Sequence, residues 1–316
     1  MEITDLTAHP VTIPYLGLEE GGVAPYVTNH NEVTASSRVV VRVETDAGIT
    51  GWGEIRPFLS SMDATVAILE EGVAPMVEGH SPYELETFRR LFFIEYTNAD
   101  LFFAPVEMAC WDIVGKDLGK PVYELLGGWT APAPTERRRD ADYDAAAEVP
   151  VAYCLGILPP EESAERAREV YEAGYDVLKT KAGRDWRQDV ERMAAMHEAT
   201  DGRLDLRVDP NQGWTMDEAV RVGAALEDRG VYLQYMEQPI RVDTHDSMAR
   251  LRERLRQPIA PNEDTYRAHN LRRLVESAAA DAVVVDMVPA GGITGLREVA
   301  GVAGDAGVSL VHHSAG

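Results

Sequence analysis

The sequence predicts an α/β protein in which a (β/α) barrel follows a smaller α+β domain. Its 316 residues are enough for a barrel of about 250 residues together with a companion domain. From Val151 onward, short apolar segments alternate with amphipathic ones, which indicates a repeat of strand and helix. The expected strand ends follow one another at intervals of 23 to 28 residues. Such uniform units favour a barrel over a doubly wound sheet.

Residues 1–128 are predicted to form the α+β domain. Apolar side chains recur at every second position in residues 36–54, and the turn sequence Asp46-Ala47-Gly48 divides them, which predicts an antiparallel hairpin. Helices are expected at residues 62–73, after the helix-capping sequence at 81–84, and at 104–118.

Residues 129–149 are rich in charge and poor in large apolar side chains, so we interpret them as a loop or linker before a barrel at 150–316. Barrel helices are predicted at 161–173 and 215–228, among others. Seven strands are expected to end near Gly156, Lys181, Asp209, Glu237, Glu263, Asp286 and His313. A complete barrel has eight strands, so we expect the C-terminal strand to be missing and two sheet edges to be unpaired.

The composition is that of a globular protein, with 45% hydrophobic and 26% charged residues. No apolar run reaches the length of about 18 residues that a membrane span needs, and no secretory signal is visible, so we expect a cytoplasmic protein. A net charge of −23 disfavours nucleic acid and anionic membranes as partners. Cys110 and Cys154 are interpreted as small core residues.

Lysine is almost absent from the chain, which has four lysines, at 116, 120, 179 and 181, against 26 arginines. Together with the acidic excess, this pattern favours a protein from a halophile, adapted to high salt. A lysine that persists in such a chain is expected to have a function. Two of the four lie two residues apart.

Polar residues at the strand ends are the functional signal, because the carboxyl ends of barrel strands converge on one mouth. Lys179 and Lys181 share one face of their strand by the period of two, so both should point into this mouth. Two crowded ammonium groups lower each other's pKa. One lysine is therefore a candidate base, and the other is free to bind an anionic group of a substrate.

Asp209, Glu237 and Glu263 end three successive predicted strands. Any one of them, taken alone, could be only a helix N-cap. Three carboxylates at one mouth, however, require a cation, and a set of oxygen ligands favours Mg²⁺ over zinc.

Asp286 and His313 end the sixth and seventh strands, which are neighbours. The carboxylate can accept a hydrogen bond from a ring nitrogen of the histidine, which would fix the tautomer and raise the basicity of the ring. By the period of two, only one of His312 and His313 faces the mouth, and His313 is the candidate. The pair supplies a second acid–base group.

On these residues the chain resembles the enolase superfamily and, within it, the mandelate racemase subgroup. Lys179 and Lys181 look like its lysine motif. Asp209, Glu237 and Glu263 look like its Mg²⁺ ligands. Asp286, followed by Gly291-Gly292, and His313 look like its acid–base dyad. The muconate cycloisomerase branch would be expected to have lysine at position 286. Because the fifth strand ends in Asn262-Glu263-Asp264, an uncommon ending in the family, the third ligand stays open between Glu263, Asn262 and Asp264.

The resemblance implies an N-terminal capping domain, a bound Mg²⁺, and removal of the α-proton of a carboxylate substrate through an enediolate. The favoured activity is dehydration of a sugar acid. Racemisation or epimerisation of a 2-hydroxy acid is the second candidate activity. A non-catalytic truncated barrel is the rival from another class. Small-molecule carboxylates are the expected partners, and a homo-oligomer is the expected assembly.

The specificity loop of the family is expected between Leu16 and Glu32. The candidate substrate contacts are Tyr15, Tyr26 and His30 in or beside this loop, and Asn211 in the barrel. The loop contains no arginine or lysine. It therefore suits a neutral, hydroxylated substrate body better than one with a second carboxylate.

The acidic excess predicts that salt stabilises the fold, because a charge of −23 repels itself at low ionic strength. Molar potassium chloride shortens the Debye length to about 3 Å and screens this repulsion. Thermal melting should give a higher midpoint in molar salt than in dilute buffer. A midpoint that salt leaves unchanged or lowers contradicts the halophile interpretation.

Overall fold

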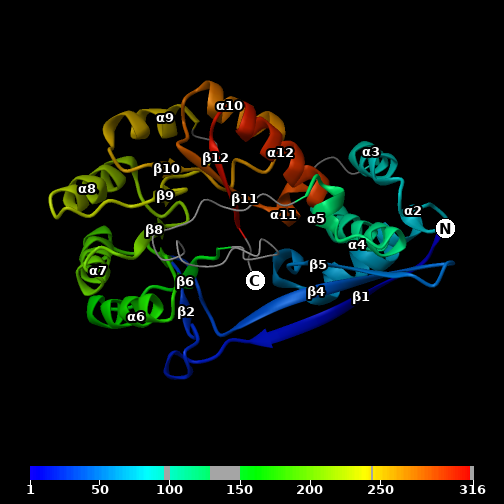
Figure 1. Cartoon of the computed structure of the whole chain (residues 1–316), viewed down its shortest axis with the longest axis horizontal. Coiled ribbons are helices and arrows are strands. Elements are labelled where there is room, and N and C mark those ends of the chain that lie inside the picture. Colours follow the sequence, from blue (N-terminus) through cyan, green and yellow to red (C-terminus); the bar gives the residue numbers. More distant parts are fainter. Residues whose placement is uncertain (96–99, 129–149, 243–244, 314–316) are drawn as a thin grey trace.

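The structure, a computed structural model, describes residues 1–95, 100–128, 150–242 and 245–313. The predicted linker at 129–149 lies outside these ranges. Figure 1 shows a sheet with helices at one end of the molecule and, beside it, a set of parallel strands ringed by helices. The fold is therefore a (β/α) barrel with an N-terminal capping domain.

An antiparallel sheet of order β1-β4-β5 forms the base of the capping domain (Figure 1). Its strands are β1 (Ile3–Pro14), β4 (Ala35–Thr45) and β5 (Thr50–Ile55). β4 and β5 pair from Val39 with Ile55 to Glu44 with Thr50, which confirms the hairpin predicted at 36–54. A second, short hairpin of β2 (Tyr26–Val27) and β3 (Glu32–Val33) extends toward the barrel.

Helices cover one face of this sheet: α1 (Met62–Ala67), α2 (Ala74–Val77), α3 (Leu85–Glu95), α4 (Asp100–Leu118) and α5 (Val122–Leu125). A π-helical turn at Ile68–Val73 joins α1 to α2, so the helix predicted at 62–73 is present. α4 lies directly on β5 because two glycines of that strand lack side chains. A Cβ atom at Gly53 would stand 1.9 Å from the carbonyl oxygen of Pro105 in α4.

Within the described ranges, seven parallel strands build the barrel, as predicted: β6 (Tyr153–Leu155), β7 (Val177–Lys181), β8 (Asp205–Asp209), β9 (Tyr235–Glu237), β10 (Ile259–Ala260), β11 (Ala282–Asp286) and β12 (Ser309–His313). Five of them pair in the order β10-β9-β8-β7-β6, and β11 pairs with β12. A backbone hydrogen bond of 2.9 Å from Val284 to the carbonyl of Pro261 joins the two sets.

The strand end predicted near Glu263 is wrong by three residues. β10 already ends at Ala260, and Glu263 lies in the loop that follows. Pro261 has no N–H with which to continue the ladder, although its carbonyl still accepts a bond from β11.

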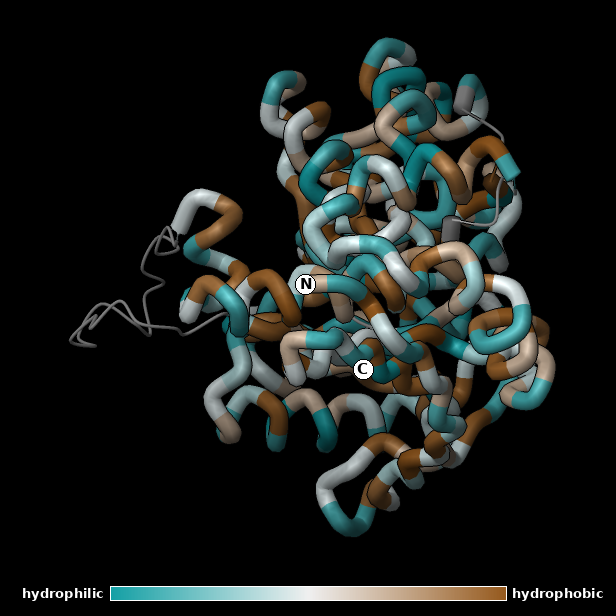
Figure 2. Tube along the Cα trace, turned by 90° about the vertical axis from the view of Figure 1, so that its right-hand side faces the viewer, coloured by the Kyte–Doolittle hydropathy of each residue, from teal (hydrophilic) through white to brown (hydrophobic). Residues whose placement is uncertain are grey.

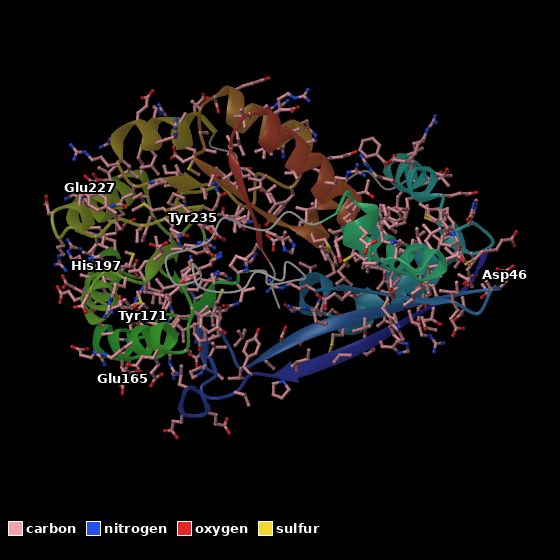
Figure 3. All side chains as sticks on the ribbon, in the orientation of Figure 1. Asp46, Glu165, Tyr171, His197, Glu227 and Tyr235 are labelled. Atoms are coloured by element: carbon pink, nitrogen blue, oxygen red, sulfur yellow. The ribbon has the colours of Figure 1, made fainter. Side chains whose placement is uncertain are left out.

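The barrel helices are α6 (Pro160–Glu172), α7 (Trp186–Ala199), α8 (Met216–Glu227), α9 (His245–Arg254), α10 (Ala268–Glu276), α11 (Met287–Ala290) and α12 (Ile293–Asp305). Buried residues recur at helical spacing, as do Ala219, Val222 and Leu226 in α8, which places one face of the helix on the strands. Figure 2 shows hydrophobic and hydrophilic residues mixed along the helical turns on the side that faces the viewer. Figure 3 shows Glu165 and His197 on the outer side of this ring, whereas the buried Tyr235 of β9 lies inside it. No helix in the described ranges has both the length and the apolar character needed to cross a bilayer.

Glu107 of α4 joins the capping domain to the barrel. Its carboxylate accepts hydrogen bonds from the backbone N–H of Ile293 (2.8 Å) and Thr294 (2.9 Å) at the start of α12, and from the Thr294 hydroxyl (2.6 Å). It also accepts one from the indole of Trp111 (2.8 Å). Gly292 precedes α12 and leaves room for this carboxylate, because a Cβ atom there would lie 2.1 Å from Glu107 Oε2. A side chain of the capping domain thus caps a barrel helix.

Replacing Glu107 with Gln should destabilise the protein by about 1–3 kcal/mol, because the amide turns one acceptor into a donor that faces other donors. Chemical denaturation measures this change in the free energy of unfolding. Glu172→Gln, at an exposed position of α6, removes the same charge and should leave stability nearly unchanged. Equal effects of the two substitutions would contradict the capping role.

Candidate active site

The register of the parallel strands brings the predicted site residues together. Lys181 at the end of β7 stands opposite Asp209 at the end of β8, and Asp286 of β11 stands opposite His313 of β12. In parallel strands the carboxyl ends lie at one edge, so these side chains open on the same mouth.

Two lysines and two carboxylates form a buried charge cluster. Lys179 Nζ lies 2.6 Å from Glu237 Oε1 and 3.0 Å from Asp209 Oδ2. Lys181 Nζ lies 2.6 Å from the same Asp209 oxygen and 2.8 Å from Asn211 Oδ1. Both lysines point to the mouth, because residues two apart on a strand share a face. Asn211 orients the ammonium group of Lys181.

The electrostatics of this cluster differ from the mutual lowering of lysine pKa values expected from the sequence. Burial by itself lowers the pKa of Lys179, but the carboxylates of Asp209 and Glu237 outweigh it and raise this pKa well above the ordinary value. Burial likewise opposes the charge of Asp209, yet the two lysines hold its pKa below the usual range. Burial, reinforced by the charge of Asp209, raises the pKa of Glu237 to about 7.

The third carboxylate, Glu263, stands apart from this cluster. Its Oε1 accepts a hydrogen bond of 3.0 Å from Gln212, and burial raises its pKa. Within the described residues, no three His, Cys, Asp or Glu side chains come close enough together to hold a metal ion. The convergence of Asp209, Glu237 and Glu263 expected from the sequence is therefore not present in this arrangement.

The residues nevertheless fit a divalent cation. Glu237 Oε2 and Glu263 Oε2 are both buried without a hydrogen-bond partner, which is costly for a carboxylate. The charge of Asp209 acts on both glutamates and disfavours their ionised forms. A hard cation such as Mg²⁺ would take up these oxygens and offset the repulsion.

The two alternative third ligands are placed differently. Asn262 uses its amide for the dyad, since Nδ2 donates to Asp286 Oδ2 (3.0 Å) and to the Val284 carbonyl (3.1 Å). Its Oδ1 lies 3.3 Å from the hydroxyl of Tyr266. Both ends of the Asn262 side chain are therefore engaged within the protein, and Asp264 is buried in the same loop.

His313 Nδ1 lies 2.6 Å from Asp286 Oδ1, which leaves Nε2 for proton transfer. Burial alone would raise the pKa of Asp286, but hydrogen bonds from His313, Asn262 and Tyr266 lower it. Tyr266 donates its hydroxyl proton to Asp286 Oδ2 over 3.0 Å. Neither Tyr266 nor Gln212 stood out in the sequence, because they act across loops and follow no periodic pattern.

A cavity of about 540 Å³ adjoins these groups, and its lining includes Tyr15, Tyr26, Cys154, Lys181, Asn211, Glu263, Asp286 and His313. The short β2–β3 hairpin reaches it because Val27 accepts a backbone hydrogen bond from Ile157, 2.8 Å long, after β6. His30 is exposed, bonds to Asn29 and does not line this cavity. Cys154 is only half-buried and lines the cavity, whereas Cys110 lies in the core as expected.

The loss of one carboxylate should weaken cation binding. Asp209→Asn removes a charge between the lysines, and we expect calorimetric titration with Mg²⁺ to show affinity lower by at least about 10-fold. Asp205→Asn is the control, because it changes the same residue type at the other end of β8, where Asp205 accepts a hydrogen bond from Gln234. This variant should bind Mg²⁺ as tightly as the unaltered chain does. Unchanged affinity in Asp209→Asn would remove that residue from the ligand set.

Residues 18–127 match the family model of the mandelate racemase / muconate lactonizing enzyme N-terminal domain, and residues 162–316 match that of the enolase C-terminal domain-like family. The chain is 28% identical to the N-succinyl-L-Arg/Lys racemase of Bacillus cereus over 298 residues, which cover 93% of this chain and 74% of the racemase. The crystal structure of that racemase superposes with a TM-score of 0.86 over 98% of this chain and 79% of its own.

The chain is also 29% identical to the arabinonate dehydratase of Saccharolobus solfataricus, over 88% of this chain and 73% of the dehydratase. A solved enolase from Streptomyces coelicolor, described as a putative sugar isomerase, is 31% identical and has a TM-score of 0.83 over 100% of this chain and 79% of its own. The chain therefore belongs to the mandelate racemase / muconate lactonizing enzyme group of the enolase superfamily.

Proposed function

We propose that the chain is a Mg²⁺-dependent enzyme that removes the α-proton of a carboxylate substrate and dehydrates a sugar acid. The observation that carries this proposal is the placement of Lys181 and His313 on the wall of one cavity, each with a carboxylate partner. An acid–base group on either side of a substrate is what such a reaction requires.

The residues of the chain have separate roles in this proposal. One of Lys181 and His313 takes the α-proton, and the other donates a proton to the hydroxyl on the next carbon, which leaves as water. The C–O bond breaks as the carbon–carbon double bond forms, and the enol product tautomerises to a 2-keto acid. When bound at Asp209, Glu237 and Glu263, Mg²⁺ would supply positive charge for the substrate carboxylate.

Asp286 argues against the muconate cycloisomerase branch, and most members of the family that resemble the chain in this residue set look like acid-sugar dehydratases. Asp286 holds the ring of His313 in one tautomer, where the muconate cycloisomerase branch would have a lysine. The similarity to an arabinonate dehydratase supports the same choice. Asn211, Tyr15 and Tyr26, which line the cavity, are proposed to contact the substrate.

Racemisation or epimerisation is the second candidate. Among the relatives are an N-succinyl-L-Arg/Lys racemase and, at 27% identity, the L-Ala-D/L-Glu epimerase of Bacillus subtilis. The same two groups serve this reaction when one removes the proton and the other returns it to the opposite face. A non-catalytic barrel is disfavoured, because every proposed proton-transfer position holds a competent residue.

Replacement of either proton-transfer group should collapse turnover of the sugar acid by about 10²- to 10⁴-fold. In Lys181→Ala, His313 is expected still to exchange the α-proton with deuterium, and in His313→Asn, Lys181 is expected to do so from the opposite face. Proton NMR in D₂O with Mg²⁺ measures this exchange for substrates of both configurations at the α-carbon.

His312→Asn is the matched control, because among the described residues this exposed neighbour on β12 forms no hydrogen bond with Asp286 and should retain turnover. Full turnover in either site variant would remove that residue from the mechanism. Exchange of the same configuration in both variants would argue against two groups on opposite faces. Turnover of a sugar acid with loss of water distinguishes dehydration from racemisation.

A further inference from the structure

Two arginines of the capping domain lie side by side at the end of its hairpin. Arg38 is in β4, and Arg56 directly follows β5. Since Val39 pairs with Ile55, the antiparallel register makes Arg38 and Arg56 the next facing positions. Arg38 is only 6% exposed, whereas Arg56 is exposed.

Neither guanidinium forms an ion pair with a carboxylate of the described chain. Among the described residues, the Arg38 side chain donates a single hydrogen bond, to the carbonyl of Ser37 at 2.9 Å. Burial lowers the pKa of Arg38, the charge of Arg56 lowers it further, and the charges of Glu54 and Tyr15 only partly offset this. A buried charge without a partner is costly. The chain has 53 acidic residues, and none of those in the described ranges forms an ion pair with the buried Arg38.

These arginines face the region of the proposed active site. Both line a cavity of about 1090 Å³ between the hairpin and the barrel. Arg56 also lines the smaller, catalytic cavity, and four further residues are common to both walls: Glu263, Tyr266, Asp286 and His313. One ligand can therefore contact Arg56 and the proton-transfer groups together.

Most acidic groups of the larger cavity are already engaged, and the exposed Glu54, which also lines it, forms no ion pair with Arg38 or Arg56 in the described chain. Asp286 bonds to His313, and Glu298 forms an ion pair of 2.5 Å with Arg89. Glu263 accepts a bond from Gln212. Glu54 offsets only part of the burial and repulsion at Arg38, so positive charge of Arg38 and Arg56 remains for a molecule that enters the cavity.

We propose that Arg38 and Arg56 form a subsite for a second anionic group of the substrate, a carboxylate or a phosphate at the end opposite the reacting carboxylate. This assignment rests on the proposed function and names its substrate class as dianionic acids. It replaces the neutral substrate body expected from the loop at 16–32, because the cations come from the hairpin instead. Two adjacent guanidinium groups can donate pairs of hydrogen bonds to a planar carboxylate or to a tetrahedral phosphate. Partial burial strengthens these charged hydrogen bonds.

A matched series of ligands tests this subsite. D-Gluconate, D-glucarate and 6-phospho-D-gluconate share one carboxylate and differ at the far end, which is a hydroxyl, a carboxylate or a phosphate. Calorimetric titration with Mg²⁺ at constant ionic strength, in the full chain carrying His313→Asn to prevent turnover, should show at least one dianion binding about 10-fold more tightly than gluconate. Preference for glucarate identifies a carboxylate, and preference for the phosphorylated acid identifies a phosphate.

Arg56→Gln, added to the same background, should remove this preference and leave gluconate binding unchanged. Arg38→Gln should act in the same way, and if that buried substitution prevents folding, the exposed Arg56 still decides the question. Arg221→Gln removes the same charge from the outer side of α8 and should preserve the preference.

Equal affinity for all three acids would overturn the subsite, and so would the absence of binding by all three. A preference for a dianion that survives Arg56→Gln would also overturn it. The proposed function fails by a different result, which is the absence of proton exchange and turnover with every acid. A preference for dianions that Arg56 controls would stand even then.

Discussion

The structure of the site depends on one constraint: carboxylates at the ends of parallel strands must be compensated by positive charge. Asp209 is almost fully buried, and it is held by Lys179 and Lys181 together. Lys179 also forms an ion pair with Glu237. A buried ion pair contributes little net stability, but removal of one partner leaves an uncompensated charge. This cluster therefore specifies the arrangement of β7, β8 and β9 at the mouth.

The two domains supply different charges to the cavity. The barrel provides carboxylates, lysines and the His313–Asp286 pair from its strand ends, and the hairpin of the capping domain provides Arg38 and Arg56. Their relative position matters for any ligand that contacts both. Glu107 contributes to it, because its carboxylate in α4 caps α12 of the barrel across the domain boundary.

Much of the site could be predicted because periodicity and register are local properties of strands. The period of two puts Lys179 and Lys181 on one face, and equal strand lengths align Asp286 with His313. The position of Glu263 could not be obtained in this way. It depends on Pro261, which ends β10 early, and on Gln212 from the preceding loop.

The sequence by itself determined the fold class, six of the seven predicted strand ends and the residue types gathered at the mouth, since all of these follow from patterns along one segment. Tertiary structure alone decided which charges are compensated. Asn262 and Tyr266 turn toward Asp286, and the sign of the pKa shift of Lys179 follows from carboxylates on two other strands. The arginines of the cavity come from a hairpin more than a hundred residues before the catalytic strands. Electrostatic interactions depend on distance in space, which no local pattern contains.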